Sequence, residues 1–342
     1  MTEATASPSS EPSVRPTSYD VAKKAGVSQS AVSRCFRPGS SISKKTKAKV
    51  LKAARELGYF PNAMASGLMT KRTGMVAVII SSLTNLYYPE VLAEITQRLS
   101  DKGARVLLFA LRSEREVGDI LEQIWRYRVD GAIVAAHLSP EQIGQFIRHE
   151  VPVVLYNRSG GDEPVSSVSC DSSGGEKLLV DKMVKAGLRA FGVLSGPQDS
   201  FVGRDRVRAV VESLAAHSLD ATIAPGQFDY ASGRMGLGQL LEETTGRLEA
   251  VLCTNDLMAI GAVDEARARS IAVPGDLSIV GFDGVAPASW ESYRLTTIRQ
   301  PVRRMSAAAV EMILARIVDP SCPPEARNFA GSLIEGASAR LA

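Results

Sequence analysis

Residues 20–36 read "DVAKKAGVSQSAVSRCF", and small apolar residues stand on both sides of a single central glycine. Ser18 is placed to N-cap a first helix that runs to about Ala25, where Gly26 breaks it. Ser28 is placed to N-cap a second helix from about Gln29 to Phe36. The small side chains that let two such helices cross closely are Ala22, Ala25, Val27, Ala31, Val32 and Phe36. The stretch predicts a helix-turn-helix, a motif whose second helix can enter the major groove of DNA.

The second expected helix carries side chains suited to reading bases. Gln29, Ser30, Ser33 and Arg34 are its polar positions, and the first two lie in the first turn, the end that meets base edges. Arg34 can donate two hydrogen bonds to a guanine edge, and Gln29 can pair with an adenine. The backbone amides at Ser28 would hold a phosphate. Taken alone, the stretch is also compatible with an ordinary pair of surface helices.

A third, basic helix follows in "KKTKAKVLKAARELG" (44–58), with Ser43 as its N-cap and Gly58 at its C-terminal end. Its expected apolar stripe consists of Val50, Leu51, Ala54 and Leu57. Three helices of this length build only a small core. From Pro61 the segment "PNAMASGLMTKRTG" (61–74) starts another helix and ends as a polar link.

The net charge of +3 conceals a strong asymmetry along the chain. Residues 1–74 carry 13 Lys and Arg against 4 Asp and Glu, which leaves 27 against 33 for residues 75–342. The head therefore has a balance of +9 and the body one of −6. A basic head on an acidic body indicates a polyanionic partner for the head alone, although a solvated basic helix face gives the same charge count.

From Met75 the pattern changes to short apolar runs separated by amphipathic stretches. The runs are "MVAVIIS" (75–81), "ARVLLFA" (104–110), "GAIVAA" (131–136), "PVVLYN" (152–157), "AFGVLSG" (190–196), "AVLCTND" (250–256) and "LSIVGFDG" (277–284). Continuous apolar strands that alternate with helices predict doubly wound parallel sheets, and their number favours two lobes. Ligands of such folds bind beyond the carboxyl ends of the strands, where this chain has "SSLTNLYY", "YNRSG", "SGPQDS", "TNDLM" and "FDGV".

Several classes of protein are disfavoured by the sequence. No apolar run is long enough to span a bilayer, and the Ser/Pro/Thr-rich residues 1–16 resemble a disordered tail more than a signal peptide, so we expect a cytoplasmic protein without a membrane partner. The four cysteines are far apart and are expected to be buried thiols, and the three histidines do not cluster into a metal site. The motifs G-x-x-x-x-G-K-[ST], G-x-S-x-G and H-E-x-x-H are absent, and "GRMGLG" (233–238) fits helix packing better than a nucleotide loop. We therefore expect neither an enzyme nor a cofactor.

The head is similar to that of the lactose-repressor (LacI/GalR-type) transcription regulators. The similarity rests on "YDVAKKAGVSQSAVSR", on the lysine-rich third helix and on "GYFPNAMASGL". It implies that Gln29, Ser30 and Arg34 lie at base-reading positions and that Ser28 and Asn62 lie where the family makes contacts at or near the DNA backbone. Tyr19 and Ser33 are also expected to contact DNA. It further implies that Ala65 and Leu68 belong to a hinge helix whose leucine wedges into a minor-groove step. One apolar residue packed in a linker helix is the alternative role for Leu68.

The resemblance continues through "VDGAIV", "SGP", "TNDLMAIGAV", "VPGDLSIVGFDG" and "LTTIRQP" to the C-terminal region. It implies a body like a periplasmic sugar-binding protein, with two α/β lobes, three crossovers and the effector between the lobes. The residues that match effector positions are Tyr88, Arg206, Tyr230, Asn255, Asp283 and Gln300. We expect the neighbouring Asp256 to cap a helix. Two departures, Leu86 in "NLYYP" and Gly284 after "GFD", touch the expected effector pocket.

The resulting expectation is an α/β protein with a small all-α helix-turn-helix head. Its segments are a disordered tail (1–16), a DNA-binding domain (17–60), a hinge helix and linker (61–74) and an effector-binding and dimerisation domain (75–342). Within the last, the N-lobe takes about 75–168 and 302–328, and the C-lobe about 169–301 and 329–342.

The expected function is sequence-specific transcription regulation, as a repressor of double-stranded pseudo-palindromic operators under the control of a sugar or sugar derivative. The lactose repressor forms tetramers through a C-terminal leucine-heptad extension, whereas this sequence reads "EGASARLA" there, so we expect a homodimer. A soluble sugar-binding protein without a DNA role is the alternative.

Overall fold

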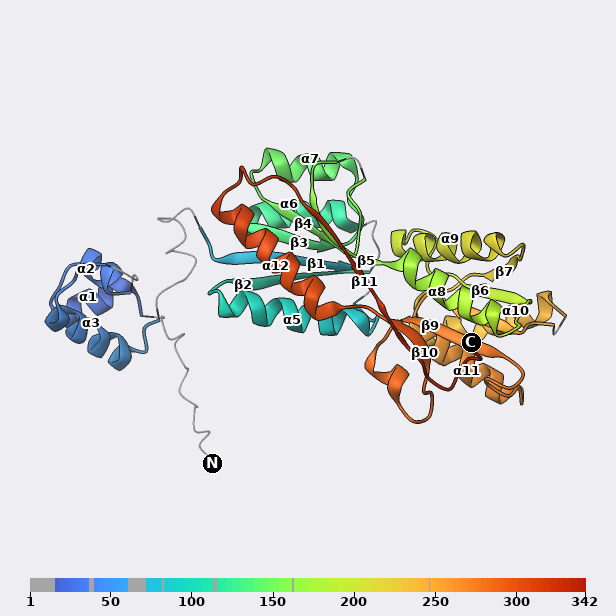
Figure 1. Cartoon of the computed structure of the whole chain (residues 1–342). Helices are drawn as coiled ribbons and strands as arrows, with labels where there is room; N and C mark the ends of the chain where they lie inside the picture. Colours follow the sequence, from blue (N-terminus) through green and yellow to red (C-terminus); the bar gives the residue numbers. More distant parts are fainter. Residues whose placement is uncertain are drawn as a thin grey trace, which may run out of the picture. The chain divides into compact units, whose positions relative to one another are not determined.

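The computed structural model describes residues 16–36, 40–60, 72–81, 83–112, 116–161, 163–245 and 247–342. The chain forms two compact units that divide between Thr73 and Gly74: a helical head and a larger α/β body (Figure 1). This arrangement confirms the expected fold class. Nearly all of the expected tail, and the hinge positions Asn62, Ala65 and Leu68, lie outside the described residues.

The head contains three helices: α1 Ser18–Ala25, α2 Gln29–Cys35 and α3 Lys44–Leu57. They enclose a small core made of Val21, Ala22, Val32, Cys35, Val50, Ala53 and Ala54. Ala53 replaces Leu51 in the expected stripe of α3, because Leu51 is only half-buried. The helix-turn-helix prediction is thus confirmed, with one core position corrected.

Side-chain caps and left-handed glycines set the ends of these helices. Thr17, and not Ser18 as expected, caps α1, since its hydroxyl accepts from the Asp20 amide and the Asp20 carboxylate accepts from the Thr17 amide. Ser28 Oγ accepts from the Ala31 amide at 3.2 Å, which confirms the expected cap of α2. Gly26, with φ of 67°, closes α1 in a conformation that favours glycine.

The first lobe of the body is built on a six-stranded parallel sheet in the order β11-β5-β4-β3-β1-β2. Its strands are β1 Met75–Ser81, β2 Arg105–Leu111, β3 Gly131–Ala135, β4 Val153–Tyr156, β5 Ser166–Asp171 and β11 Ala326–Ala330. Its helices are α5 Tyr87–Asp101, α6 Val117–Tyr127, α7 Pro140–Arg148 and α12 Val302–Val318. Alternate residues of β1 pack into two cores, one beneath α5 and α12 and the other beneath α6 and α7 (Figure 1).

The second lobe repeats this plan with a sheet in the order β12-β10-β9-β8-β6-β7, in which only the edge strand β12 is antiparallel. Its strands are β6 Phe191–Leu194, β7 Ala221–Ala224, β8 Ala250–Cys253, β9 Ser278–Asp283, β10 Thr296–Arg299 and β12 Ser332–Ile334. Its helices are α8 Ser172–Lys185, α9 Phe201–Ala216, α10 Tyr230–Glu243 and α11 Asp256–Ala268, with a short 3-10 helix, η2, at Ala286–Ser289. The seven apolar runs identified in the sequence all form strands, whereas β5, β7, β10, β11 and β12 were not anticipated.

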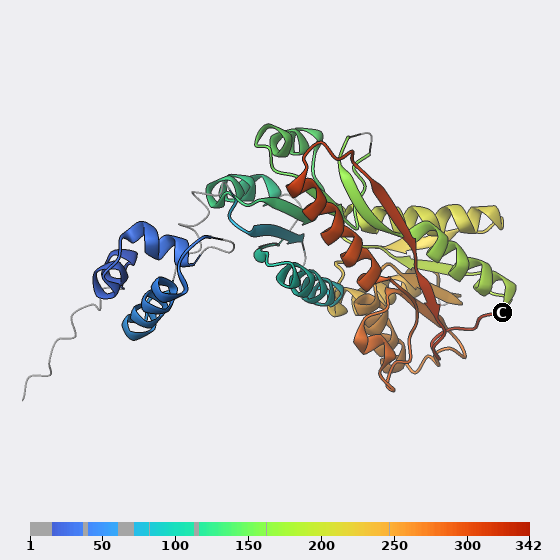
Figure 2. The same cartoon turned by 60° about the vertical axis from the view of Figure 1, so that its left-hand side comes forward.

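The chain passes three times between the lobes: from β5 to α8, from β10 to α12 and from β11 to β12. In Figure 2 the red segment that follows α12 runs along both lobes. Each lobe is therefore assembled from segments that are far apart in the sequence. The carboxyl ends of the strands of both sheets meet where the lobes face each other, which is where ligands of such folds bind.

The glycine-rich stretch "GRMGLG" lies within α10 and packs against α11. A Cβ atom on Gly233 would lie 2.2 Å from the carbonyl oxygen of Met258, and one on Gly261 would lie 2.2 Å from that of Tyr230. The two helices can approach this closely only because both positions lack a side chain. This contact confirms the helix-packing interpretation of the motif.

Three of the four cysteines are buried free thiols, whereas Cys322 is half-exposed, contrary to expectation. Within the described ranges, no helix is long and apolar enough to cross a membrane. The same residues contain no group of three His, Cys, Asp or Glu side chains that could hold a metal ion.

Candidate functional site

Helix α2 buries one face and leaves the other open. Val32 and Cys35 are buried in the head core, whereas Ser28, Ser30 and Arg34 are exposed. Ser33 is half-buried, and so is Gln29, which donates from Nε2 to Ser18 Oγ at 3.3 Å. The open face therefore offers a guanidinium, an amide and hydroxyls, which are the groups that recognise base edges and phosphates.

The head also exposes an aromatic ring on α1 and positive charge on α3. Tyr19 on α1 is 72% exposed, although most large apolar side chains of the head are covered. Five lysines of α3 are exposed: Lys44, Lys45, Lys47, Lys49 and Lys52. Glu56 pairs with Lys24 at 3.0 Å and lies 3.9 Å from Lys52, so the N-terminal half of α3 keeps most of the positive charge. Such a surface suits a polyanion.

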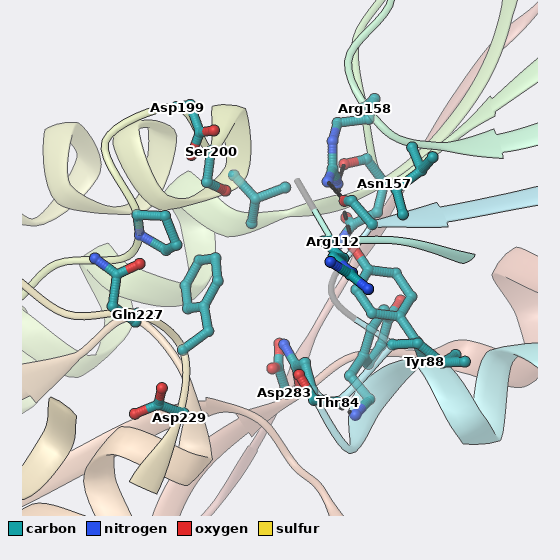
Figure 3. A pocket seen from close by; sticks show the side chains of 18 of the residues that line it. Thr84, Tyr88, Arg112, Asn157, Arg158, Asp199, Ser200, Gln227, Asp229 and Asp283 are labelled. Carbon is teal, nitrogen blue, oxygen red and sulfur yellow. Dashed lines mark hydrogen bonds between the residues drawn. The ribbon is translucent and has the colours of Figure 1, made fainter. Parts of the chain in front are cut away.

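The body contains a cavity of about 770 Å³ where the two lobes face each other (Figure 3). Strand-end residues of both sheets line it, as expected for this fold. From the first lobe these are Ser81, Leu83, Thr84, Asn85, Tyr87, Tyr88, Ala110, Leu111, Arg112, Asn157 and Arg158. From the second lobe they are Pro197, Asp199, Ser200, Val202, Arg206, Gln227, Phe228, Asp229, Asp283 and Gln300.

A buried polar cluster forms the second-lobe base of this cavity. Arg206 on α9 donates from Nη2 to Asp283 Oδ1 at 3.0 Å and from Nη1 to the Thr254 carbonyl at 2.6 Å. Gln300 Nε2 donates to the same Asp283 oxygen at 2.7 Å. The guanidinium of Arg206 also lies 3.9 Å from the centroid of the Phe282 ring. The cluster holds these side chains in fixed orientations toward the cavity.

Asp283 has both a perturbed carboxyl pKa and an unusual backbone angle. Removal from water raises the pKa of its carboxyl, while the Arg206 guanidinium and the Gln300 amide act in the opposite direction. Its φ of 122° is one that residues other than glycine rarely adopt. Strained backbone of this kind persists where the surroundings enforce it, and it clusters at binding sites.

Three polar atoms of the cluster lack a hydrogen-bond partner although they are buried: Arg206 Nε, a donor, and the acceptors Asp283 Oδ2 and Gln300 Oε1. Buried polar groups are nearly always paired, so each unpaired one calls for an explanation. All three residues line the cavity. A ligand with adjacent donor and acceptor groups, such as a polyol, would satisfy these atoms.

Four of the six expected effector residues line the cavity: Tyr88, Arg206, Asp283 and Gln300. Two do not and need correction. The Tyr230 hydroxyl donates to Asp264 at 2.9 Å on the outer face of α10 and α11, away from this cavity. Asn255 is fully buried as the N-cap of α11, where its Oδ1 accepts from the Met258 amide.

The cap at Asn255 also corrects the role expected of Asp256. The Asp256 carboxylate accepts from Thr297 Oγ1 at 2.6 Å and from the Val285 amide at 2.8 Å. It thus ties the start of α11 to β10 and to the segment after β9. The polar side chains of the "TNDLM" motif therefore make their hydrogen bonds inside the second lobe, and the motif stabilises that lobe.

Several lining residues were not selected from the sequence. Asn157 and Arg158 stood in the quoted tail "YNRSG" but were not assigned a role. Arg112 follows β2, and the general rule on strand ends would have found it. Gln227, Phe228 and Asp229 follow β7, a four-residue strand whose sequence, "ATIA", gives little signal.

One of the two departures from the family pattern, Gly284, has a local structural explanation. Gly284 has φ of 69°, and a Cβ atom there would lie 2.7 Å from the Cα of Arg299. Arg299 occupies that space, donates to the Gly284 carbonyl and pairs with Glu90 of the opposite lobe. Near Leu86, Asn85 Oδ1 accepts from the Tyr87 amide at 3.1 Å and so shapes the start of α5.

A helix-turn-helix head attached to a two-lobed α/β body with a polar cavity defines a class of DNA-binding regulators. A family model described as "Bacterial regulatory proteins, lacI family" matches residues 17–62, and one described as "Periplasmic binding protein-like domain" matches residues 180–339. The HTH-type transcriptional regulator AscG of Escherichia coli (strain K12) is 30% identical over 331 residues, which are 93% of this chain and 96% of AscG.

Solved structures give the same result. The lac repressor dimer bound to operator and the anti-inducer ONPF is similar with a TM-score of 0.85 and 27% identity, over 95% of this chain and 99% of that one. A complex of the regulator CelR with cellobiose has a TM-score of 0.72 and 27% identity, over 95% and 100% of the two chains. The chain belongs to the lacI family of bacterial regulatory proteins. It is a DNA-binding transcription regulator and not an enzyme.

Proposed function

We propose that this regulator is a repressor whose affinity for its operator is controlled by a small molecule bound between the lobes of the body. The observation that carries the proposal is the cavity beside Arg206 and Gln300, whose buried Nε and Oε1 atoms lack partners. The open, basic face of the head in the same chain supports the DNA-binding part. A repressor of this kind needs both sites.

On DNA, two heads of a homodimer each read one half-site of a pseudo-palindrome. Residues that contact DNA in this proposal are Tyr19, Ser28, Gln29, Ser30, Ser33 and Arg34. The hinge, with Asn62, Ala65 and Leu68, orders on the cognate site, where Leu68 wedges into a minor-groove step. The similarity to a lac repressor dimer bound to operator supports this assembly.

In the body, Tyr88, Arg206, Asp283 and Gln300 bind an effector that is a sugar or sugar derivative. The cavity supports this class because its donors and acceptors are numerous and a tyrosine ring is available beside them. A relative, CelR, has been solved with cellobiose. The effector must prefer one arrangement of the two lobes, because otherwise it could not change the affinity for DNA.

Each expected segment has one role in this proposal. Residues 17–60 read DNA, residues 61–74 form the hinge, and residues 75–342 bind the effector and dimerise. Within the body, the N-lobe expected at about 75–168 and 302–328 is extended here to the ends of β5 (Asp171) and β11 (Ala330), and the C-lobe takes the rest. A regulator of this type works on the chromosome, so we place it in the cytoplasm.

Fluorescence anisotropy with labelled DNA from upstream of the gene tests the proposal. We expect saturable binding to one pseudo-palindromic segment, weakened by salt in proportion to the phosphates contacted. Scrambled DNA of the same composition is the control. If no segment binds more tightly than the scrambled one, the protein instead fits a soluble binding protein without a DNA role.

A further inference from the structure

The hydroxyl of Ser18 is not used to cap the first helix of the head. Thr17 occupies the cap position of α1, where its hydroxyl accepts from the Asp20 amide and its own amide donates to the Asp20 carboxylate. Ser18, the first residue of α1, instead accepts a hydrogen bond at its Oγ from Gln29 Nε2 at 3.3 Å. Gln29 is the first residue of α2. The Ser18 hydroxyl therefore acts on the helix that carries the expected base-reading side chains.

The two helices that carry this pair are packed firmly on each other. Residues of both helices lie in the buried core of the head, and Figure 1 shows α1 and α2 close together there. In the turn between them, the Val27 amide donates to the Ala22 carbonyl at 3.0 Å. Side chains supported by helices are held more precisely than side chains on loops. Ser18 is thus a fixed point from which the Gln29 side chain can be oriented.

The hydrogen bond restricts a flexible side chain and leaves its base-pairing groups in place. Glutamine loses as much rotamer freedom on ordering as any side chain, so one bond to a fixed hydroxyl removes part of that cost in advance. The contact with Ser18 uses one of the two N–H groups on Nε2. The second N–H and Oε1 are the groups that pair with N7 and the N6 amino group of an adenine. The bond is therefore compatible with full bidentate reading.

The next polar side chain of α2 is held in a similar way. Ser30 Oγ lies 3.0 Å from Ser28 Oγ, and Ser28 also caps the helix. Gln29 and Ser30 thus each have a hydrogen-bond partner within the head. Preorganised contacts of this kind favour one orientation of a side chain and so favour one base over the others.

We propose that Ser18 is a positioning residue for base reading. It holds the Gln29 amide in the orientation that pairs with adenine, and it contributes to sequence preference without touching a base itself. This inference rests on the proposed function, which assigns Gln29 to DNA, and it adds a residue of α1 to the determinants of specificity.

Base preference at each position of the half-site tests the proposal with the full-length protein. Selection from a randomised double-stranded DNA library gives the preferred half-site, and anisotropy titrations then compare it with all single-base variants. Gln29→Ala identifies the position that the glutamine reads. Ser18→Ala should lower the preference at that same position about threefold or more and leave the other positions and the salt dependence unchanged. Ser18→Thr keeps a hydroxyl and should restore most of the preference.

Two further variants separate positioning from other roles of Ser18. The double variant Ser18→Ala/Gln29→Ala should match Gln29→Ala, because the effect of the serine passes through the glutamine. Lys23→Gln, at an exposed position of the same helix, is the control: loss of its charge can weaken binding to all sequences alike but should leave the preference at each position unchanged. Circular dichroism checks that every variant is folded.

Three outcomes with Ser18→Ala overturn the proposal. They are an unchanged base preference, an equal loss at every position of the half-site, which indicates a role in packing α1 on α2, and a further loss in the double variant, which indicates direct contact of Ser18 with DNA. An unchanged preference in Gln29→Ala would overturn the base contact in the proposed function and this inference with it. A change in Gln29→Ala without one in Ser18→Ala overturns this inference alone.

Discussion

Arg206 Nη2 lies 3.0 Å from Asp283 Oδ1, and both side chains are only 2% exposed. The pair joins α9 to the end of β9, so it belongs to the packing of the second lobe as much as to its cavity. Removal of one partner would leave a charge in a site that excludes water. The cluster is therefore expected to couple stability to recognition.

A double-mutant cycle measures this coupling. Arg206→Ala and Asp283→Ala should each lower the free energy of unfolding by about 3–5 kcal/mol, and the double variant should lose less than their sum. Denaturant unfolding followed by circular dichroism gives the values. Arg204→Ala, at an exposed position of the same helix, is the control and should change stability by about 0.5 kcal/mol or less. Additive effects would show that the pair contributes no net coupling.

Recognition in the cavity is tested by comparing two positions with opposite expectations. Gln300→Ala should weaken effector binding about tenfold or more, because its Oε1 and its contact with Asp283 are lost. Tyr230→Phe should leave binding within about twofold, because that hydroxyl pairs with Asp264 outside the cavity. Titration calorimetry with the effector found by screening reports both. A large effect of Tyr230→Phe would place the ligand elsewhere.

Arg34 tests the role of the open face of α2. Arg34→Ala should weaken operator binding by about 1–3 kcal/mol and relax the sequence preference at one position of each half-site. Lys45→Ala, on the exposed face of α3, should weaken binding to all sequences alike and reduce the salt dependence. Anisotropy titrations against operator and single-base variants separate these patterns. Unchanged affinity and preference in Arg34→Ala would mean that another surface reads the bases.

Ser28 has a structural and a proposed DNA role that two substitutions separate. Ser28→Ala removes the cap of α2 and should lower the stability of the head by about 1 kcal/mol. Ser28→Asp keeps a capping side chain but places a negative charge where a phosphate is expected, so the head stays folded and DNA binding falls. Thermal unfolding and anisotropy on the same samples decide the matter. Equal DNA affinity of wild type and Ser28→Asp would exclude a phosphate at this site.

Glu176 gives the protein a predictable pH dependence. Burial raises the pKa of its carboxyl from 4.5 to about 8, although the Arg206 guanidinium opposes the shift. Between these values the folded state binds a proton that the unfolded state has released, so rising pH lowers the free energy of unfolding by up to about 1.4 kcal/mol per pH unit. Glu176→Gln should therefore match wild type near pH 4 and be more stable near pH 8.

Denaturant unfolding from pH 4 to pH 8 measures that difference. Glu122→Gln, which removes an exposed carboxyl, is the matched control and should follow the wild-type curve. A constant offset between Glu176→Gln and wild type at every pH would contradict the assignment.

Local patterns predicted the parts of the fold that are locally determined. The caps at Ser28 and Ser43, the left-handed glycines and the seven apolar strands all follow from side chains acting on their own backbone. The five strands that were missed are short or polar, such as "ARNFA" in β11 and "ATIA" in β7. Their pairing depends on distant partners, so a local pattern carries little signal for them.

The cavity was predictable as a place and less so as a set of residues. The rule on strand ends located it, and Arg206, Asp283 and Gln300 line it as the resemblance implied. Asn255 shows the limit of prediction from sequence. An asparagine before a helix can cap that helix or bind a ligand, and the sequence does not show that Asn255 bonds the Phe228 carbonyl and the Met258 amide. Arg158 lines the cavity but was not expected there, because its burial beside Tyr88 and Ser81 depends on three separate elements.

β11 and β12 are the last strands to be synthesised, so the two units of the chain can complete their folding at different times. The head folds from contacts among residues 18–57, and it can do so while the ribosome is still making the body. Both sheets of the body, in contrast, await strands at 326–330 and 332–334, and Ser338 then donates to the carbonyl of Ile279. A nonsense mutation late in the gene would thus release a polypeptide with an intact DNA reader and an unfinished sensor. Such a truncated product would escape control by the signal, and its aggregation and degradation would determine how much of it persists in the cell.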